Sequence, residues 1–115
     1  MDEKVLKWLW DIKLAIDEID GYFEHQDKDF FQYQKNIMLK RAIDRDLEII
    51  GEAMNRALQN DSSIENEISN AKAIIGLRNQ VIHAYDNISD ENIWSILINH
   101  LPKFKIEVNN LITQK

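Results

Sequence analysis

The chain has 115 residues, of which 44% are hydrophobic, with three Gly and one Pro, so residues 1–115 fit one domain with a single core and few turns. The absence of Cys excludes disulfides, thiolate metal sites and thiol catalysis, and a formal charge of −6 argues against a protein that coats nucleic acid nonspecifically. Neither a membrane-spanning apolar run nor a cationic leader stands in the sequence, so we expect a cytoplasmic protein that does not bind membranes.

Apolar residues recur at the three- and four-residue steps of amphipathic helices through most of the chain. The first predicted helix runs from residue 3 to about 25, and the second from about 35 to 60. Between them, Asp27 or Asp29 is suited to cap a short turn. Residues 64–70 are ambiguous and fit one helical turn.

Two further helices complete the predicted fold. The third has its apolar stripe from Ala73 onward and ends near Tyr85, and Ser89 is a suitable N-cap for the fourth. Pro102 lies inside the apolar stripe of that last helix, so we expect a kink or break there. No segment has the pattern of a strand. The sequence therefore predicts an all-α protein, an antiparallel bundle of four to five helices.

Residues 78–85, Arg-Asn-Gln-Val-Ile-His-Ala-Tyr, carry the clearest indication of chemistry. Arg78 offers planar, bidentate donors suited to phosphate. His83 follows five residues later and is the side chain type that exchanges a proton near neutral pH. Tyr85 adds a phenol two residues further on. Together these groups fit phosphoryl chemistry without a metal, and no other part of the chain has the ligands of a metal site.

The spacing of these residues favours a symmetric dimer. On an ideal helix Arg78 and Tyr85 lie about 20° apart, whereas Arg78 and His83 lie about 140° apart. Asn79 and His83 form an i,i+4 pair on a neighbouring face. Arg78 and His83 converge only if the helix loosens near His83 or a second subunit supplies the facing wall. In a homodimer, two copies of the segment would line one cleft.

The reaction that fits these groups is cleavage of RNA by its own 2′-hydroxyl. His83 would act as general base or acid, Arg78 would stabilise the charge on the phosphorane oxygens, and Asn79 would orient the imidazole or hold a phosphate oxygen. The alternative interpretation is structural: an Arg and a His on an amphipathic helix commonly serve as an ion-pair donor and a capping or half-buried polar residue.

Two blocks of sequence, residues 45–53 and 75–85, resemble the HEPN family and, more narrowly, the HepT-type toxins of toxin–antitoxin pairs. The R-x4-H-x-Y motif of that family is matched by Arg78, His83 and Tyr85. The similarity runs from the first helix to about residue 112. The connector 62–73 departs from the family, because it lacks a Pro-x-Ile-Pro-Trp-like segment.

The resemblance implies a HEPN-like helical homodimer that acts as a metal-independent RNase toxin of a type VII-like system and needs no cofactor. Its expected partners are an RNA substrate, such as structured tRNA, and a minimal nucleotidyltransferase antitoxin that transfers AMP to Tyr85. Two alternatives remain open: a non-catalytic HEPN binding or regulatory subunit of a nucleotidyltransferase, and a structural helical dimer.

Glu52 is the one further candidate for the site. It follows Gly51 in an otherwise apolar part of the second predicted helix. One interpretation is that its carboxylate reaches the cleft and pairs with Arg78. The other is a carboxylate that faces the bundle and is satisfied by hydrogen bonds.

Overall fold

A computed structural model describes residues 1–24, 27–77 and 90–114, and these residues are helical with short connections. No strand occurs in these ranges, so the predicted all-α bundle is confirmed. The elements in chain order are α1 (Glu3–Tyr22), α2 (Phe30–Lys35), α3 (Ile37–Asn60), the 3-10 helix η1 (Ser62–Asn66), α4 (Ala71–Ile75), α6 (Asp90–Ser95), the π-helix η2 (Ile96–His100) and α7 (Leu101–Thr113).

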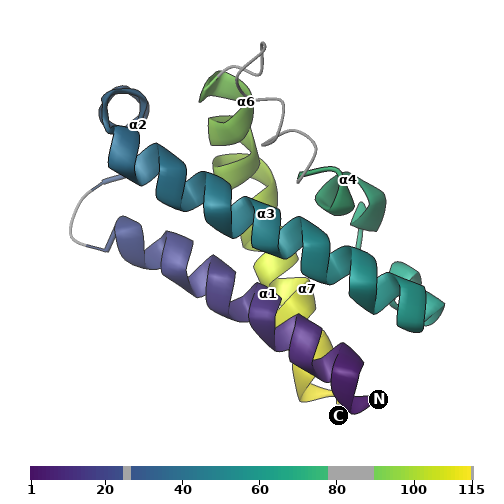
Figure 1. Cartoon of the computed structure of the whole chain (residues 1–115). Coiled ribbons are helices and arrows are strands. Elements are labelled where there is room, and N and C mark those ends of the chain that lie inside the picture. Colours follow the sequence, from purple (N-terminus) through teal and green to yellow (C-terminus); the bar gives the residue numbers. More distant parts are fainter. Residues whose placement is uncertain (25–26, 78–89, 115) are drawn as a thin grey trace.

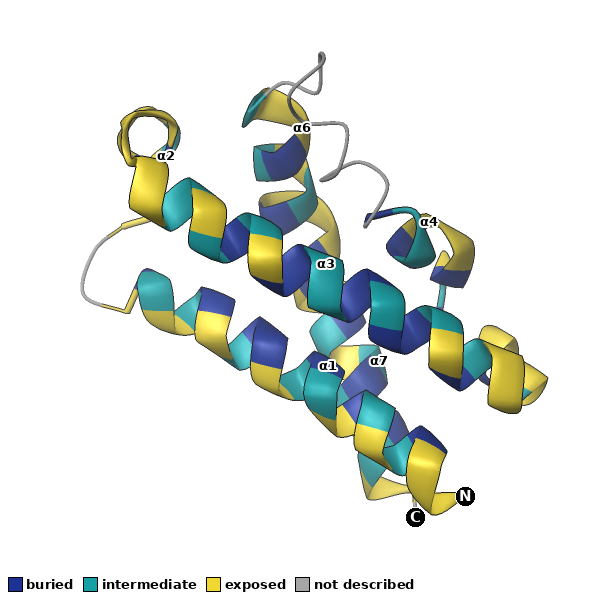
Figure 2. Ribbon diagram, in the orientation of Figure 1, coloured by how far each residue is buried: buried dark blue, intermediate teal, exposed yellow. Residues whose placement is uncertain are grey.

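The long helices α1 and α3 run antiparallel at the centre of the fold, with α7 packed on α1, and the two chain termini lie at the same end (Figure 1). Buried and exposed residues alternate along α1 and α3, as Figure 2 shows. The fully buried side chains of α1 are those predicted by the periodicity, because burying one apolar stripe per helix drives their association. They include Val5, Leu9, Ile12, Ile16 and Ile19.

The helix boundaries follow local capping. α1 ends at Tyr22, earlier than predicted, where the Phe23 N–H bonds to the carbonyls of Asp20 and Gly21. The Asp29 carboxylate accepts a 2.9 Å hydrogen bond from the Phe31 N–H, so the predicted cap by Asp29 is confirmed. The N-cap of α3 is Asn36, which the apolar periodicity does not indicate.

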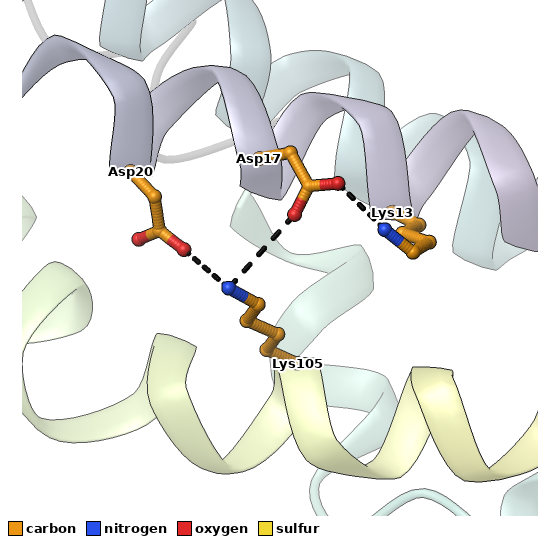
Figure 3. A network of polar contacts seen from close by, with 4 residues as sticks. All are labelled: Lys13, Asp17, Asp20 and Lys105. Carbon is orange, nitrogen blue, oxygen red and sulfur yellow. Dashed lines mark hydrogen bonds and ion pairs between the residues drawn. The ribbon is translucent and has the colours of Figure 1, made fainter. Parts of the chain in front are cut away.

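A polar network joins α7 to α1 at their surface (Figure 3). The Lys105 ammonium lies 2.7 Å from the Asp20 carboxylate and 3.9 Å from that of Asp17, while Lys13 lies 2.6 Å from Asp17. These side chains are partly exposed, so each pair contributes little to stability.

The predicted break in the last helix is confirmed, and it lies on the N-terminal side of Pro102. The turn Ile96–His100 is a π-helix, and Pro102 stands in the first turn of α7. Proline has no N–H to donate to the carbonyl four residues earlier, and its ring clashes with that carbonyl in an α-helix. The wider π turn removes this conflict without ending the helical path.

The third predicted helix is only partly described. Regular structure begins at Ala71, directly after Asn70, and α4 ends at Ile75, where the Gly76 N–H bonds to the Lys72 carbonyl. Residues 78–85 of the predicted helix, and the predicted cap Ser89, lie outside the described residues. The ambiguous segment 64–70 begins within the 3-10 helix η1, which starts earlier, at Ser62, and ends at Asn66. Within the described ranges, no helix is long and apolar enough to cross a membrane.

Candidate functional site

Four of the five predicted site residues lie outside the described part of the chain. They are Arg78, Asn79, His83 and Tyr85. Their mutual geometry therefore stays a prediction from the sequence. The structure instead shows how the chain is held immediately before residue 78 and immediately after residue 89.

On the N-terminal side, the chain reaches the motif from a buried position. Ile74 and Leu77 both belong to the hydrophobic core, and Leu77 is only 6% exposed. Between them, a Cβ atom on Gly76 would lie 3.3 Å from the Ala73 carbonyl oxygen, closer than most such contacts. Gly76 itself has φ −66° and ψ −14°, in the right-handed helical region that any residue adopts, so the backbone at this position does not require a glycine.

On the C-terminal side, an ion pair holds the start of α6 to α3. The Lys40 ammonium lies 3.0 Å from one oxygen of the Asp90 carboxylate and 3.1 Å from the other. Both side chains are about a quarter exposed, at 29% and 25%. The contact bridges helices that are far apart in sequence, and it lies one residue after the end of segment 78–89.

An aromatic cluster fixes the same end of α6. Trp94 lies with its ring centroid 5.2 Å from that of Tyr33, and 5.9 Å from those of Phe23 and Phe30. Phe23 directly follows α1, whereas Phe30 and Tyr33 belong to α2, and such ring pairs add to the free energy gained by burial. Burial, and then the negative charges of Asp44 and Asp90, raise the pKa of the Tyr33 hydroxyl well above its usual range.

Glu52 lies on the surface side of α3 and lines a groove between α1 and α3. One carboxylate oxygen lies 3.0 Å from Nε of Arg56, an i,i+4 pair. The groove has a volume of about 420 Å³, and Lys7, Trp8 and Arg45 also line it. The predicted pairing of Glu52 with Arg78 cannot be compared with the structure, since Arg78 lies outside the described residues.

Sequence reasoning missed a buried acid, Asp46, on the inner side of α3. It is 3% exposed, and it accepts a 2.8 Å hydrogen bond from the Tyr22 hydroxyl of α1. Burial raises the pKa of Asp46 to about 6. The available signal was spacing, because Asp46 stands three residues after Ile43 and four before Ile50, on the face that the core stripe occupies.

Among the described residues, no three His, Cys, Asp or Glu side chains gather closely enough to hold a metal ion. Lys40 and Glu52 both come from α3, so one helix contacts Asp90 at the start of α6 and also lines the groove.

Comparison with known proteins identifies the family. Residues 12–111 match the family model described as "Ribonuclease HepT-like". "Putative RNase MJ1380" of Methanocaldococcus jannaschii is 35% identical over 104 residues, which cover 90% of this chain and 93% of that protein. "Putative RNase MJ0127" of the same organism is 32% identical, covering 94% and 87%.

A bacterial relative, "Putative RNase TTE0752" of Caldanaerobacter subterraneus, is 28% identical over 86 residues, covering 75% of this chain and 76% of that protein. No solved structure matches the chain. The matched range runs from within α1 to near the end of α7, and it includes Arg78, His83 and Tyr85 of the R-x4-H-x-Y pattern. The chain therefore belongs to the ribonuclease HepT-like family, the HEPN-type family predicted from its sequence.

Proposed function

We propose that this protein is a metal-independent endoribonuclease and the toxin of a type VII-like toxin–antitoxin pair in the cytoplasm. The observation that carries the proposal is the R-x4-H-x-Y motif, Arg78, His83 and Tyr85, inside the region that matches the HepT-like family. The names of the related proteins support RNA as the substrate.

The proposed reaction is attack of a ribose 2′-hydroxyl on the adjacent phosphate, which breaks the bond to the 5′-oxygen of the next nucleotide. His83 takes the proton from the attacking hydroxyl or gives one to the leaving oxygen. Arg78 stabilises the charge on the phosphorane oxygens, and Asn79 orients the imidazole. The leaving 5′-oxygen receives a proton, so the products are a cyclic phosphate and a free 5′-hydroxyl.

The proposed site is completed in a homodimer, because Arg78 and His83 lie about 140° apart on one ideal helix and come together when one subunit supplies Arg78 and the other His83. The anchoring of the chain by Leu77 and by the Lys40–Asp90 pair supports a motif segment held at both ends. Such an arrangement suits catalysis, because a catalytic group needs a scaffold that limits its movement.

The proposed switch is transfer of AMP to the Tyr85 hydroxyl by a nucleotidyltransferase antitoxin. The chain has three tyrosines, and the structure explains why two of them are poor acceptors. Tyr33 is 1% exposed, and the Tyr22 hydroxyl donates a hydrogen bond to the Asp46 carboxylate. Tyr85 is the remaining candidate. A phosphodiester there would compete with RNA phosphate for Arg78.

The test is cleavage of total RNA and of tRNA by the purified protein in the presence of EDTA. His83→Ala and Arg78→Ala should each abolish cleavage without changing the melting temperature. A loss of stability by about 1 kcal/mol, with no cleavage by the wild type, would instead favour a structural role.

Co-expression of the two inactive variants tests the composite dimer. If Arg78 and His83 of different subunits form one site, a mixed dimer contains one intact site, and activity should return to roughly a quarter of the wild-type value. No recovery in a verified mixed dimer would contradict the composite site while leaving the nuclease proposal in place.

A further inference from the structure

A pocket of about 350 Å³ lies between α4 on one side and η2 with α7 on the other. Ile74, Leu77 and Phe104 form its apolar floor, and each of them is buried. Asn70, Asn99 and His100 stand at its exposed rim. This volume is at the lower end of the range for small-molecule sites, which are also mainly apolar with a few polar groups.

Both walls of the pocket contain irregular backbone. Asn70 has a φ of 60°, and it is the one non-glycine residue of the described chain with a positive φ. Opposite, Asn99 and His100 belong to the π-helical turn η2. Left-handed non-glycine residues and π turns are less stable than regular structure, and they occur frequently at functional sites. This irregular backbone carries Asn70, Asn99 and His100, which line the pocket.

The two walls are tied together at the end of the pocket by Glu107 of α7. Its carboxylate accepts a 3.0 Å hydrogen bond from the Ser69 N–H and another from the Ser69 hydroxyl. Glu107 is thus engaged in holding the α4 side to α7. Lys103, also on α7, is exposed at the rim and leaves a positive charge beside the opening.

This chemistry fits a nucleobase. The apolar floor suits the flat faces of a purine or pyrimidine, and the Asn70 amide offers both donors and an acceptor to its edges. The Asn99 amide donates one N–H to the Ser95 hydroxyl, which leaves its second N–H and its carbonyl oxygen for a base. Lys103 is suited to an attached phosphate. The pocket also adjoins the proposed catalytic segment, because Leu77 is followed directly in the chain by Arg78.

We propose that this pocket binds one nucleobase of the RNA substrate and so selects the nucleotide beside the cleaved bond, an inference that rests on the proposed function. Base selection in single-stranded RNA commonly works in this way, through an unstacked base that enters a pocket and is read at its edges. The overall charge of −6 makes backbone contacts alone a weak basis for RNA binding, so such a pocket would supply needed affinity.

The experiment titrates the four ribonucleoside 5′-monophosphates separately into the full chain and follows the backbone and side-chain amides by NMR. Shift changes should gather at Asn70, Asn99 and His100, and the affinity should differ among the bases. Ala73→Phe should weaken binding at least tenfold, because Ala73 is exposed and lines the pocket. Asn110→Phe, an exposed position of α7 outside the pocket, is the matched control and should bind as the wild type does.

The proposal is overturned if the shifts lie elsewhere or if Ala73→Phe binds as well as Asn110→Phe. Should Ala73→Phe fail to fold, as shown by its melting curve, His100→Ala serves in its place, since His100 is exposed at the rim. Retained base preference in a folded His100→Ala, Asn99→Ala double variant would equally overturn it.

Cleavage assays separate this proposal from the proposed nuclease activity. His83→Ala should stop RNA cleavage and leave monophosphate binding unchanged, whereas Ala73→Phe should alter which nucleotide precedes the cut. A wild-type protein that binds monophosphates in the pocket but cleaves no RNA would refute the nuclease and retain the base pocket. Cleavage with no binding at the pocket would refute the base pocket alone.

Discussion

The Tyr22 hydroxyl of α1 donates a 2.8 Å hydrogen bond to the Asp46 carboxylate of α3, inside the interface between the two central helices. Burial raises the pKa of Asp46 to about 6, the hydrogen bond from Tyr22 opposes that rise, and Glu18 adds to it. Burial, followed by the bond to Asp46, raises the pKa of Tyr22 to about 12. The two central helices are therefore joined by a group that titrates in mildly acidic solution.

The first prediction is that this carboxyl makes folding stability fall as pH rises. The folded pKa of Asp46 is about 6, against about 3.9 in an unfolded chain. Between these pH values the folded state binds more protons than the unfolded state. The protonated Asp46 carboxyl therefore contributes its full stabilisation to the folded state below about pH 4, and this stabilisation is lost as pH rises through about pH 6. Asp46→Asn removes this titration. From pH 4 to pH 7 the free energy of unfolding of the variant, taken relative to that of the wild type, should therefore rise by at most about 3 kcal/mol.

Urea denaturation at several pH values across this window measures the effect. Asp27→Asn is the matched control, because it removes one carboxylate at an exposed position and should keep the wild-type pH dependence. An identical pH dependence in Asp46→Asn and the wild type would show that Asp46 is not the titrating group.

The second prediction concerns the Lys40–Asp90 pair that ties α6 to α3. Lys40→Met should lower stability by about 1 kcal/mol, since the pair is partly buried and the substitution leaves Asp90 without its partner. RNA cleavage should fall several-fold at a temperature where the variant remains folded, because the chain just after the motif segment loses its anchor.

The control for this prediction is Lys7→Met, which breaks the exposed pair with Asp11 on α1. It should change stability by less than about 0.5 kcal/mol and leave cleavage intact. Equal cleavage by the two folded variants would mean that the Lys40–Asp90 pair stabilises the fold without supporting the site.

The helices could be predicted from sequence because their stability depends on burial of one apolar stripe, which leaves a periodic pattern. Thus the sequence predicts the first helix from residue 3 to about 25, and the structure buries the apolar stripe of α1 from Val5 to Ile19. The role of Asp46 could not be predicted in the same way. Its partner Tyr22 stands 24 residues away on another helix, and only the packing of α1 on α3 brings them together.

In the candidate site, too, some features follow from the sequence and others depend on the three-dimensional structure. The types of its groups follow from the sequence motif, whereas the end of α4 at Ile75 is not indicated by the apolar periodicity, which continues past that residue. Glu52 was selected as a polar residue within an apolar run, but the structure places it in a surface groove with Arg56. The arrangement of Arg78, His83 and Tyr85 stays a prediction, because these residues lie outside the described ranges.

The third prediction separates two roles of Glu52. If Glu52 supports the catalytic segment, Glu52→Gln should lower cleavage several-fold while changing stability by only about 0.5 kcal/mol, the value of an i,i+4 pair. Arg56→Gln breaks the same ion pair but keeps the carboxylate, so it should retain cleavage. Rates of RNA cleavage and urea denaturation of both variants make the comparison. If both substitutions had the same small effect, the role of Glu52 would be limited to its pair with Arg56.

The fourth prediction concerns the switch at Tyr85. After co-expression with the neighbouring nucleotidyltransferase, intact mass spectrometry should show a wild-type chain heavier by one or more AMP units. Tyr85→Phe should lack the addition, still cleave RNA and escape silencing, because the Phe ring has no hydroxyl to accept the nucleotide. Tyr22→Phe is the control and should still be modified, since the Tyr22 hydroxyl is already bonded to Asp46.

An AMP unit that persists on Tyr85→Phe would place the modification on another side chain and refute the switch. An unchanged mass of the wild type, with cleavage nevertheless suppressed, would mean that the antitoxin inhibits by binding. In that case Arg78 remains free to hold RNA phosphate, and high salt, which weakens exposed ionic contacts between proteins, should restore cleavage. Covalent AMP would persist under the same conditions, so salt dependence distinguishes the two modes of inhibition.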